Sequence, residues 1–175
     1  MNMPTDPARE LADLGRLTAT AAEWLERHGE RLGAVVEDVS KWSPRMQIDH
    51  AALAAASVCG AVERILAGAP GCVEPGEPSA QLSAILTTGF IPRGTAEAPE
   101  KMRPAAGVTH DEALAHVAAL RGRLDALTPR VAEIASAGLR FPHFALGPMT
   151  ASEWLLFARI HTDHHLAIAR DILDL

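Results

Sequence analysis

Histidines are concentrated near the carboxyl end of the chain, where the segment HTDHH (residues 161–165) holds three of the eight in the sequence. On an α-helix, residues four apart lie roughly 40° apart in azimuth and about 6 Å apart along the axis. His161 and His165 therefore project from one face and can both reach one metal ion. A metalloprotease motif is not indicated, because the glutamate that acts as general base in HExxH is missing from this pair.

The helix face that carries this histidine pair is otherwise apolar. Its other members are Trp154, Phe157, Ala158, Ile168 and Ile172. An apolar stripe on a helix usually faces the interior of the protein, and imidazoles buried there need polar partners. A divalent metal ion would satisfy both rings at once.

A third ligand is predicted at His50, which shares a stripe with Leu53, Ala54, Ser57, Ala61 and Ile65 and so points inward as well. Taken alone, an inward histidine is more often a hydrogen-bonded core residue than a metal ligand. Three neutral imidazoles leave open positions for water or substrate, as in catalytic zinc sites. Such an ion acidifies a bound water or thiol, or polarises a carbonyl group. Imidazole ligands suit zinc, nickel, iron or copper and do not choose among them.

The remaining histidines have weaker patterns. His164 lies about 100° around the helix from His165, and two roles stay open: it replaces His165 as a ligand, or it carries protons at the edge of the cavity. His143 precedes the last helix, where packing within a loop is favoured over a place at the cavity mouth. A solvated surface position is predicted for His28, His110 and His116.

Cysteines and acidic residues near the histidines have structural explanations. Cys59 falls on the opposite side of the helix from His50 and is predicted to be a small buried hydrophobic residue. Cys72 lies in a Gly/Pro-rich loop and has no predicted role. Asp49 and Asp163 would suit histidine orientation, but adjacent helical residues point about 100° apart. Both are therefore predicted to lie on solvated faces.

The elements that must position these residues are helical nearly throughout, because β-branched alternation is rare. Clusters of Pro and Gly at 68–76 and 89–107 divide the chain into four long helices. The first is expected at about Asp6–Val39, bent or split at Gly29 or Gly33. The second begins with Ser43 as N-cap and Pro44 in the first helical position and ends near Gly68.

The third and fourth helices each begin with a capping box, formed by Thr109 with Glu112 and by Thr150 with Glu153. The third runs to about Ala137 and is kinked or divided at Pro129, and the fourth runs to the end of the sequence. A loop of roughly 40 residues, with a short helix at Ser79–Thr88, joins helices two and three; loops of this length usually have a function or structure of their own. The expected architecture is an all-α four-helix bundle with one long crossover.

Composition limits the class of protein. The chain has 175 residues and a formal net charge of −6, so one domain spanning 1–175 is expected. Its acidity argues against nucleic-acid and membrane-surface binding. Neither a signal peptide in MNMPTDPARE nor a membrane-spanning segment nor a disulfide framework is expected. A soluble cytoplasmic protein is predicted.

Three segments, taken in order, resemble the DinB/YfiT-like superfamily of metalloenzymes, and in particular an uncharacterised bacterial branch of it. They are WSPRMQIDH, GFIPRG and FPHFALGPMTASEWLLFARIHTDHHLAIA, and the resemblance extends from about Trp42 to Ile172. The stretch from GPMTASEW through HTDHH is the most specific part. The resemblance implies a four-helix bundle, a homodimer, and a divalent metal ion bound by three histidines. These ligands correspond here to His50, His161 and His165, with zinc or nickel expected and iron or manganese as alternatives.

Some members of that superfamily use bacillithiol, mycothiol or glutathione as cosubstrate, and others resemble hydrolases. This sequence has no obvious thiol-recognition motif, so the resemblance supports a metal site better than it supports any one reaction. The first hypothesis is an enzyme in which the metal activates water or a low-molecular-weight thiol against a small electrophile. His164 would then carry protons and Arg93 would hold an anionic group, although a single loop arginine is usually solvated.

Two other hypotheses stay open. One is a non-catalytic metal-binding or stress-response protein, and the other is a helical interaction module without metal. A fourth protein ligand such as His164 would favour a structural metal, whereas an open coordination position would favour an enzyme.

Overall fold

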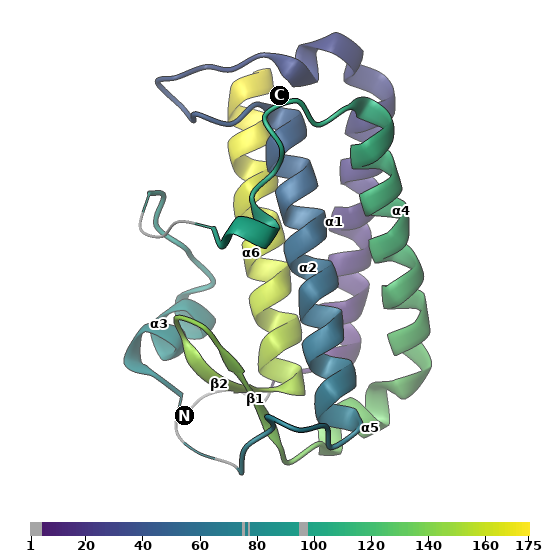
Figure 1. Ribbon diagram of the computed structural model, residues 1–175, viewed down its shortest axis with the longest axis vertical. Coiled ribbons are helices and arrows are strands. Elements are labelled where there is room, and N and C mark those ends of the chain that lie inside the picture. The colour runs from purple at the N-terminus through teal and green to yellow at the C-terminus, as the bar shows by residue number, and fades with distance from the viewer. Residues whose placement is uncertain (1–4, 75, 77, 95–97) are drawn as a thin grey trace.

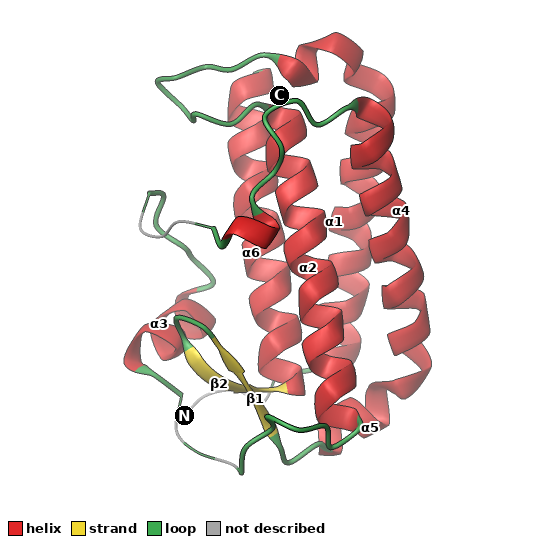
Figure 2. Cartoon of the chain, viewed as in Figure 1, coloured by secondary structure: helices red, strands yellow, loops and turns green. Residues whose placement is uncertain are grey.

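The computed structural model describes residues 5–74, 76, 78–94 and 98–175. Residues 1–4, the start of the segment in which no signal peptide is expected, lie outside this range. The long helices are α1 (Pro7–His28), α2 (Pro44–Leu66), α4 (His110–Leu127) and α6 (Ala151–Leu173), and they confirm the predicted all-α class (Figure 1). The shorter elements are η1 (Gly29–Gly33), α3 (Ala80–Thr88), η2 (Glu100–Met102), η3 (Thr128–Arg130), α5 (Val131–Ser136), β1 (Arg140–His143) and β2 (Gly147–Thr150) (Figure 2).

The four long helices form a bundle in which each packs against two neighbours. Helix α2 contacts α6 and α4, and α1 contacts the same two helices from the other side. Helices α1 and α6 run in one direction, whereas α2 and α4 run in the other (Figure 1). Because α2 and α4 are parallel, the chain between them must return along the bundle. This return is the predicted long crossover, and its elements α3 and η2 lie against α6 and α2, respectively.

Apolar stripes on the four helices meet in the centre of the bundle and form its core. Its fully buried large residues include Leu14, Leu25, Ile48, Leu120, Leu155 and Ile160. Burial of these side chains is the main favourable term in folding, and it leaves polar residues on the outer faces of the helices. Within the described residues, no helix combines the length and the apolarity needed to cross a membrane.

One predicted helix ends earlier than expected, and another is divided where predicted. The first stops at His28 rather than Val39, because Gly29 adopts a φ of 50°, a region that glycine enters without steric cost. A 3-10 turn follows over Gly29–Gly33. The third is divided at Pro129, as predicted: α4 ends at Leu127, Pro129 lies in η3 and lacks the N–H that a helix interior requires, and α5 continues to Ser136. The second helix begins at its predicted N-cap, Ser43. The short helix expected at Ser79–Thr88 is present as α3, which begins at Ala80 with Ser79 as its N-cap.

The β-hairpin before α6 was not predicted. Its strands pair in register from Arg140 with Thr150 to His143 with Gly147. Pro142 lies opposite Pro148, so neither residue can donate a ladder hydrogen bond, and such a segment does not look like a strand pair in sequence. Main-chain hydrogen bonds to Val73 and the 2.8 Å ion pair of Arg140 with Glu153 hold the hairpin in place.

The capping box that starts α6 should contribute measurably to stability. The Glu153 main-chain N–H donates to Thr150 Oγ1 at 3.2 Å, and Thr150 N–H donates to Glu153 Oε2 at 2.8 Å. Replacement Thr150→Ala removes one cap, so we expect the free energy of unfolding in urea to fall by about 1 kcal/mol. Thr20→Ala, in the middle of α1, is the control and should change it by less than about 0.5 kcal/mol. Equal losses in both variants would contradict a capping role.

Candidate metal centre

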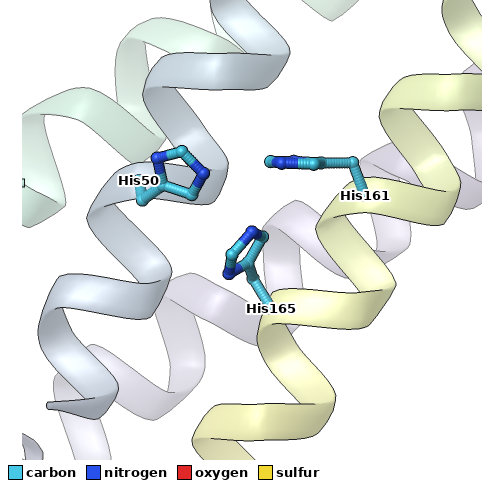
Figure 3. A group of neighbouring side chains, drawn as sticks. All are labelled: His50, His161 and His165. Carbon is cyan, nitrogen blue, oxygen red and sulfur yellow. The ribbon is translucent and has the colours of Figure 1, made fainter. Parts of the chain in front are cut away.

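The three histidines singled out in the sequence meet between two helices. His50 comes from α2, and His161 and His165 come from α6 (Figure 3). One ring nitrogen from each lies within 4.8 Å of those from the other two. Antiparallel packing of α2 on α6 produces this meeting, because it places the first turns of α2 beside the second half of α6. The structure thus brings together the three predicted ligands.

The ring of His50 is oriented by the crossover. Its Nδ1 lies 2.6 Å from the main-chain oxygen of Met102 in η2. A carbonyl oxygen can only accept, so Nδ1 carries the hydrogen and Nε2 keeps its lone pair. His50 therefore presents an unprotonated nitrogen on the side away from Met102, which is the form that binds a metal ion.

A chain of hydrogen bonds orients His165 in the same way. Its Nδ1 lies 2.6 Å from Oε1 of Gln47, and Nε2 of Gln47 donates to Ser40 Oγ at 2.9 Å. Ser40 Oγ also accepts from the Trp42 main-chain N–H at 3.0 Å. The amide nitrogen of Gln47 is thus engaged by Ser40, and its oxygen accepts the Nδ1 hydrogen of His165. Contacts of this kind orient metal-binding histidines and fix their tautomer.

All three imidazoles are held in the neutral form. Burial lowers the pKa of His161 to about 3, with the neighbouring histidines adding to the effect. Burial also lowers the pKa of His50 and of His165. A metal ion binds only deprotonated ligands, so near neutral pH it would displace few protons from these rings.

The other two residues given catalytic roles lie beside this group. His164 is not part of the three-histidine group; its ring hydrogen-bonds to the backbone of Ile91, and burial lowers its pKa. Arg93 Nη2 lies 2.6 Å from Oδ2 of Asp171, with both side chains 46% exposed. Arg93 is therefore paired with a carboxylate and is not a free anion-binding group.

The three histidines border a cavity of about 1330 Å³. Its walls come from α2, α6, the crossover and the hairpin. Trp42 lies beside the histidines, with its ring 5.1 Å from that of His50. Most residues of the predicted stripes on α2 and α6 line this cavity. Ala61, Trp154 and Ala158 are at the same time buried in the core, as expected of an inward face. The crossover encloses the space next to these two helices.

His143 combines the two positions that its sequence pattern left as alternatives, packing within the loop and lining the cavity. Its Nδ1 accepts from the main-chain N–H groups of Ala145 and Leu146, at 3.1 and 3.2 Å, so it packs within the loop as predicted. Its ring also lines the cavity and lies 5.4 Å from that of Trp154 and 5.3 Å from that of Phe157.

Two residues predicted to be solvated have a defined contact instead. Asp49 is 2% exposed, and its Oδ1 lies 2.7 Å from Nδ1 of His116. The reason is the packing of α4 on the face of α2 that carries Asp49, since a buried carboxylate needs a partner. The pair joins α2 to α4. Asp163 is exposed and Cys59 is buried, both as predicted, and burial raises the pKa of the Cys59 thiol to about 11.

Three residues that shape the site were not identified from the sequence. Gln47 lies one helical turn before His50, and this spacing could have indicated that its side chain is on the same face of the helix as His50. Trp42 was noted only as the start of the WSPRMQIDH segment. Met102 acts through its main-chain oxygen, a group that every residue has, so its type carries no indication of this role.

The accepting role of His143 Nδ1 predicts a pH effect on stability. Burial lowers the pKa of His143 from 6.5 to about 4. Between these pH values the unfolded chain binds more protons than the folded chain, so stability is lost as the pH falls from about 6.5 to 4. In an NMR titration we expect this ring to change protonation near pH 4. His143→Gln should flatten the dependence of stability on pH in that window. His110→Gln, at the start of α4, is the control and should leave this dependence unchanged. A His143 ring that titrates near 6.5 would contradict this prediction.

Comparison with known proteins places the chain in a family. A family model described as the DinB superfamily matches residues 11–169. No curated protein and no solved structure matches the chain. Because the match covers most of the sequence, the chain belongs to the DinB superfamily.

Proposed function

We propose that this DinB-superfamily chain binds a divalent metal ion through His50, His161 and His165 and is a metal-dependent enzyme. Its nucleophile would be water or a low-molecular-weight thiol, and its substrate a small electrophile held in the adjacent cavity. The observation that carries the proposal is the convergence of three ring nitrogens within 4.8 Å of one another at the wall of that cavity.

The donor set fits a divalent transition metal. Three neutral nitrogens suit zinc or nickel, and iron or manganese are alternatives. The chemistry that such an ion supplies is a lowered pKa for a coordinated water or thiol and polarisation of a carbonyl group. Gln47 and Met102 hold two of the rings in the metal-binding tautomer, so the chain supplies a pre-oriented site.

The surroundings of the site favour an enzyme over a structural metal centre. Among the residues that the structure describes, no fourth His, Cys, Asp or Glu joins the group. His164, the candidate fourth ligand, is bonded to the backbone of Ile91 instead. A set of three protein ligands leaves a coordination position for a substrate or solvent molecule, as catalytic sites require.

His164 is the residue best placed to move a proton. It lines the cavity, and its ring lies 5.0 Å from that of His165. Burial favours its neutral form, so the ring nitrogen not bonded to Ile91 can take up a proton from a reacting group. Arg93 has no part in the proposal, because Asp171 occupies its guanidinium group.

Metal analysis tests the ligand set. Elemental analysis of the untagged protein should show near-stoichiometric metal, and His161→Ala and the double variant His50→Ala/His161→Ala should show none. Circular dichroism should show that the helical fold survives in both variants. His110→Ala, at the start of α4, is the control and should retain the metal. A parent protein that holds no metal and takes up no added zinc, nickel or manganese would overturn the proposal and favour an interaction module.

The positioning role of Gln47 gives a second test. Gln47→Leu keeps a side chain of similar size but removes the acceptor for His165 Nδ1. We expect a drop of about 10–100-fold in metal affinity, measured by competition with a chromophoric chelator. Gln81→Leu on α3 is the matched control and should leave the affinity unchanged. Equal affinity in the Gln47→Leu protein and the parent would show that the hydrogen bond does not support the ligand.

Activity should follow the metal. Metal-loaded protein is to be screened with esters and amides in water, and separately with small electrophiles and a low-molecular-weight thiol. We expect turnover in one arm, lost in His161→Ala and reduced in His164→Ala. Turnover that persists in the metal-free His161→Ala protein would contradict a metal-dependent reaction.

A further inference from the structure

The cavity extends far beyond the three histidines. The residues that line it on α2 run from Gln47 through Ser57 to Arg64, and on α6 they run from Trp154 to Ile168. At a rise of 1.5 Å per residue, each stretch is roughly 20 Å long or more. Because the helices are antiparallel, the histidines lie toward one end of this space, and the hairpin and Trp154 lie at the other.

The walls between these ends are mainly apolar. The crossover contributes Ile85, Phe90, Ile91, Pro92, Pro99 and Met102, and the hairpin contributes Phe141, Pro142, Phe144 and Leu146. Small residues of α2, among them Ala54 and Ala61, form the floor. Ligand sites are generally concave and apolar with few polar groups. Four histidines and Gln47 gather at one end of this cavity, whereas His143 lies at the hairpin end and Ser57, Gln81 and Thr88 are uncharged polar residues elsewhere in the lining.

Among the residues that the structure describes, the charged side chains that line the cavity are not available to pair with a ligand group in its middle. Glu63 is paired with Arg123 at 2.7 Å. Arg64 is exposed, donates to the Pro70 oxygen at 2.7 Å and lies over the ring of Phe141. Lys41 is exposed as well, at the histidine end. A carboxylate or phosphate buried in the middle would therefore lose its hydration without gaining a partner, which is costly.

Two phenylalanines of the cavity lining are largely exposed to solvent. Phe90, just after α3, is 62% exposed, and Phe144, in the hairpin turn, is 70% exposed. Both are counted among the residues that line the cavity. Exposed apolar surface beside a concave apolar site is typical of a binding site, because a ligand that covers such rings removes them from water.

We infer that the substrate is an uncharged molecule with an extended apolar body, such as an acyl chain, lying along α2 and α6 with its polar reacting group at the histidines. The position of the reacting group rests on the proposed metal centre, whereas the apolar body rests on the cavity walls alone. The body of the cavity accordingly holds the electrophile, and the polar nucleophile reaches the histidine end.

Binding of n-alkanols to metal-free protein tests the apolar body without any metal. The series 1-butanol, 1-hexanol and 1-octanol is titrated in the presence of a chelator, with tryptophan fluorescence and calorimetry as readouts, since Trp42 and Trp154 line the cavity. We expect affinity to rise about fourfold for each added methylene. The compound 1,8-octanediol, which has the same length and a second hydroxyl, should bind at least about tenfold more weakly than 1-octanol.

A filled cavity provides the specificity control. Ser57 lies in the cavity wall between the histidines and the hairpin and is exposed, so Ser57→Phe adds a ring to the empty space without entering the core. We expect this variant, checked by circular dichroism, to lose the chain-length dependence. Ala119→Phe adds the same ring on the exposed face of α4 and should bind like the parent. Ser57→Leu, a smaller blocker, should give an intermediate loss.

Absence of chain-length dependence in the parent, or its persistence in folded Ser57→Phe protein, would overturn the inference. Metal content measured on the same samples keeps this outcome separate from the proposed function. If the protein binds metal but not alkanols, the metal centre is supported and the apolar substrate class is contradicted. If the protein binds alkanols but never takes up metal, the apolar ligand is supported and the metal-dependent reaction is contradicted.

Discussion

Antiparallel packing of α2 against α6 is the constraint on which the rest of the site depends. It sets His50 opposite His161 and His165, and it forms the long wall of the cavity beside them. The four long helices run up, down, down and up in chain order, so α2 and α4 are parallel (Figure 1). Since parallel helices need a long return, the same order supplies the crossover that encloses the cavity.

Burial decides the chemistry of the histidine group. Imidazoles on an otherwise apolar wall must be either hydrogen-bonded or metal-bound, and here two of them donate through Nδ1 to Met102 and Gln47. These bonds leave the opposite nitrogens free of protons and directed toward a common space. Burial favours the neutral form of all three rings, and the hydrogen bonds select the tautomer of two of them.

The sequence was sufficient for features that depend on local spacing. Helical spacing placed His161 and His165 on one face, and the capping residues located the starts of α2, α4 and α6. Features that depend on how helices rotate against one another were missed, such as the contact of Asp49 with His116, which are 67 residues apart. The hairpin was missed because its facing prolines remove the pattern that identifies strands. The role of Met102 was missed because it acts through its main-chain oxygen, which is the same in every residue type.

The hydrogen bond from His50 to the crossover has an evolutionary consequence. Since the acceptor is the main-chain oxygen at position 102, any residue that keeps the local backbone path can supply it. Substitution at this position is then tolerated as far as histidine orientation is concerned, whereas an insertion or deletion in the neighbouring loop displaces the oxygen. Constraint on this segment therefore falls on its length more than on its residue types, and in particular on its spacing to α4, the third long helix of the bundle.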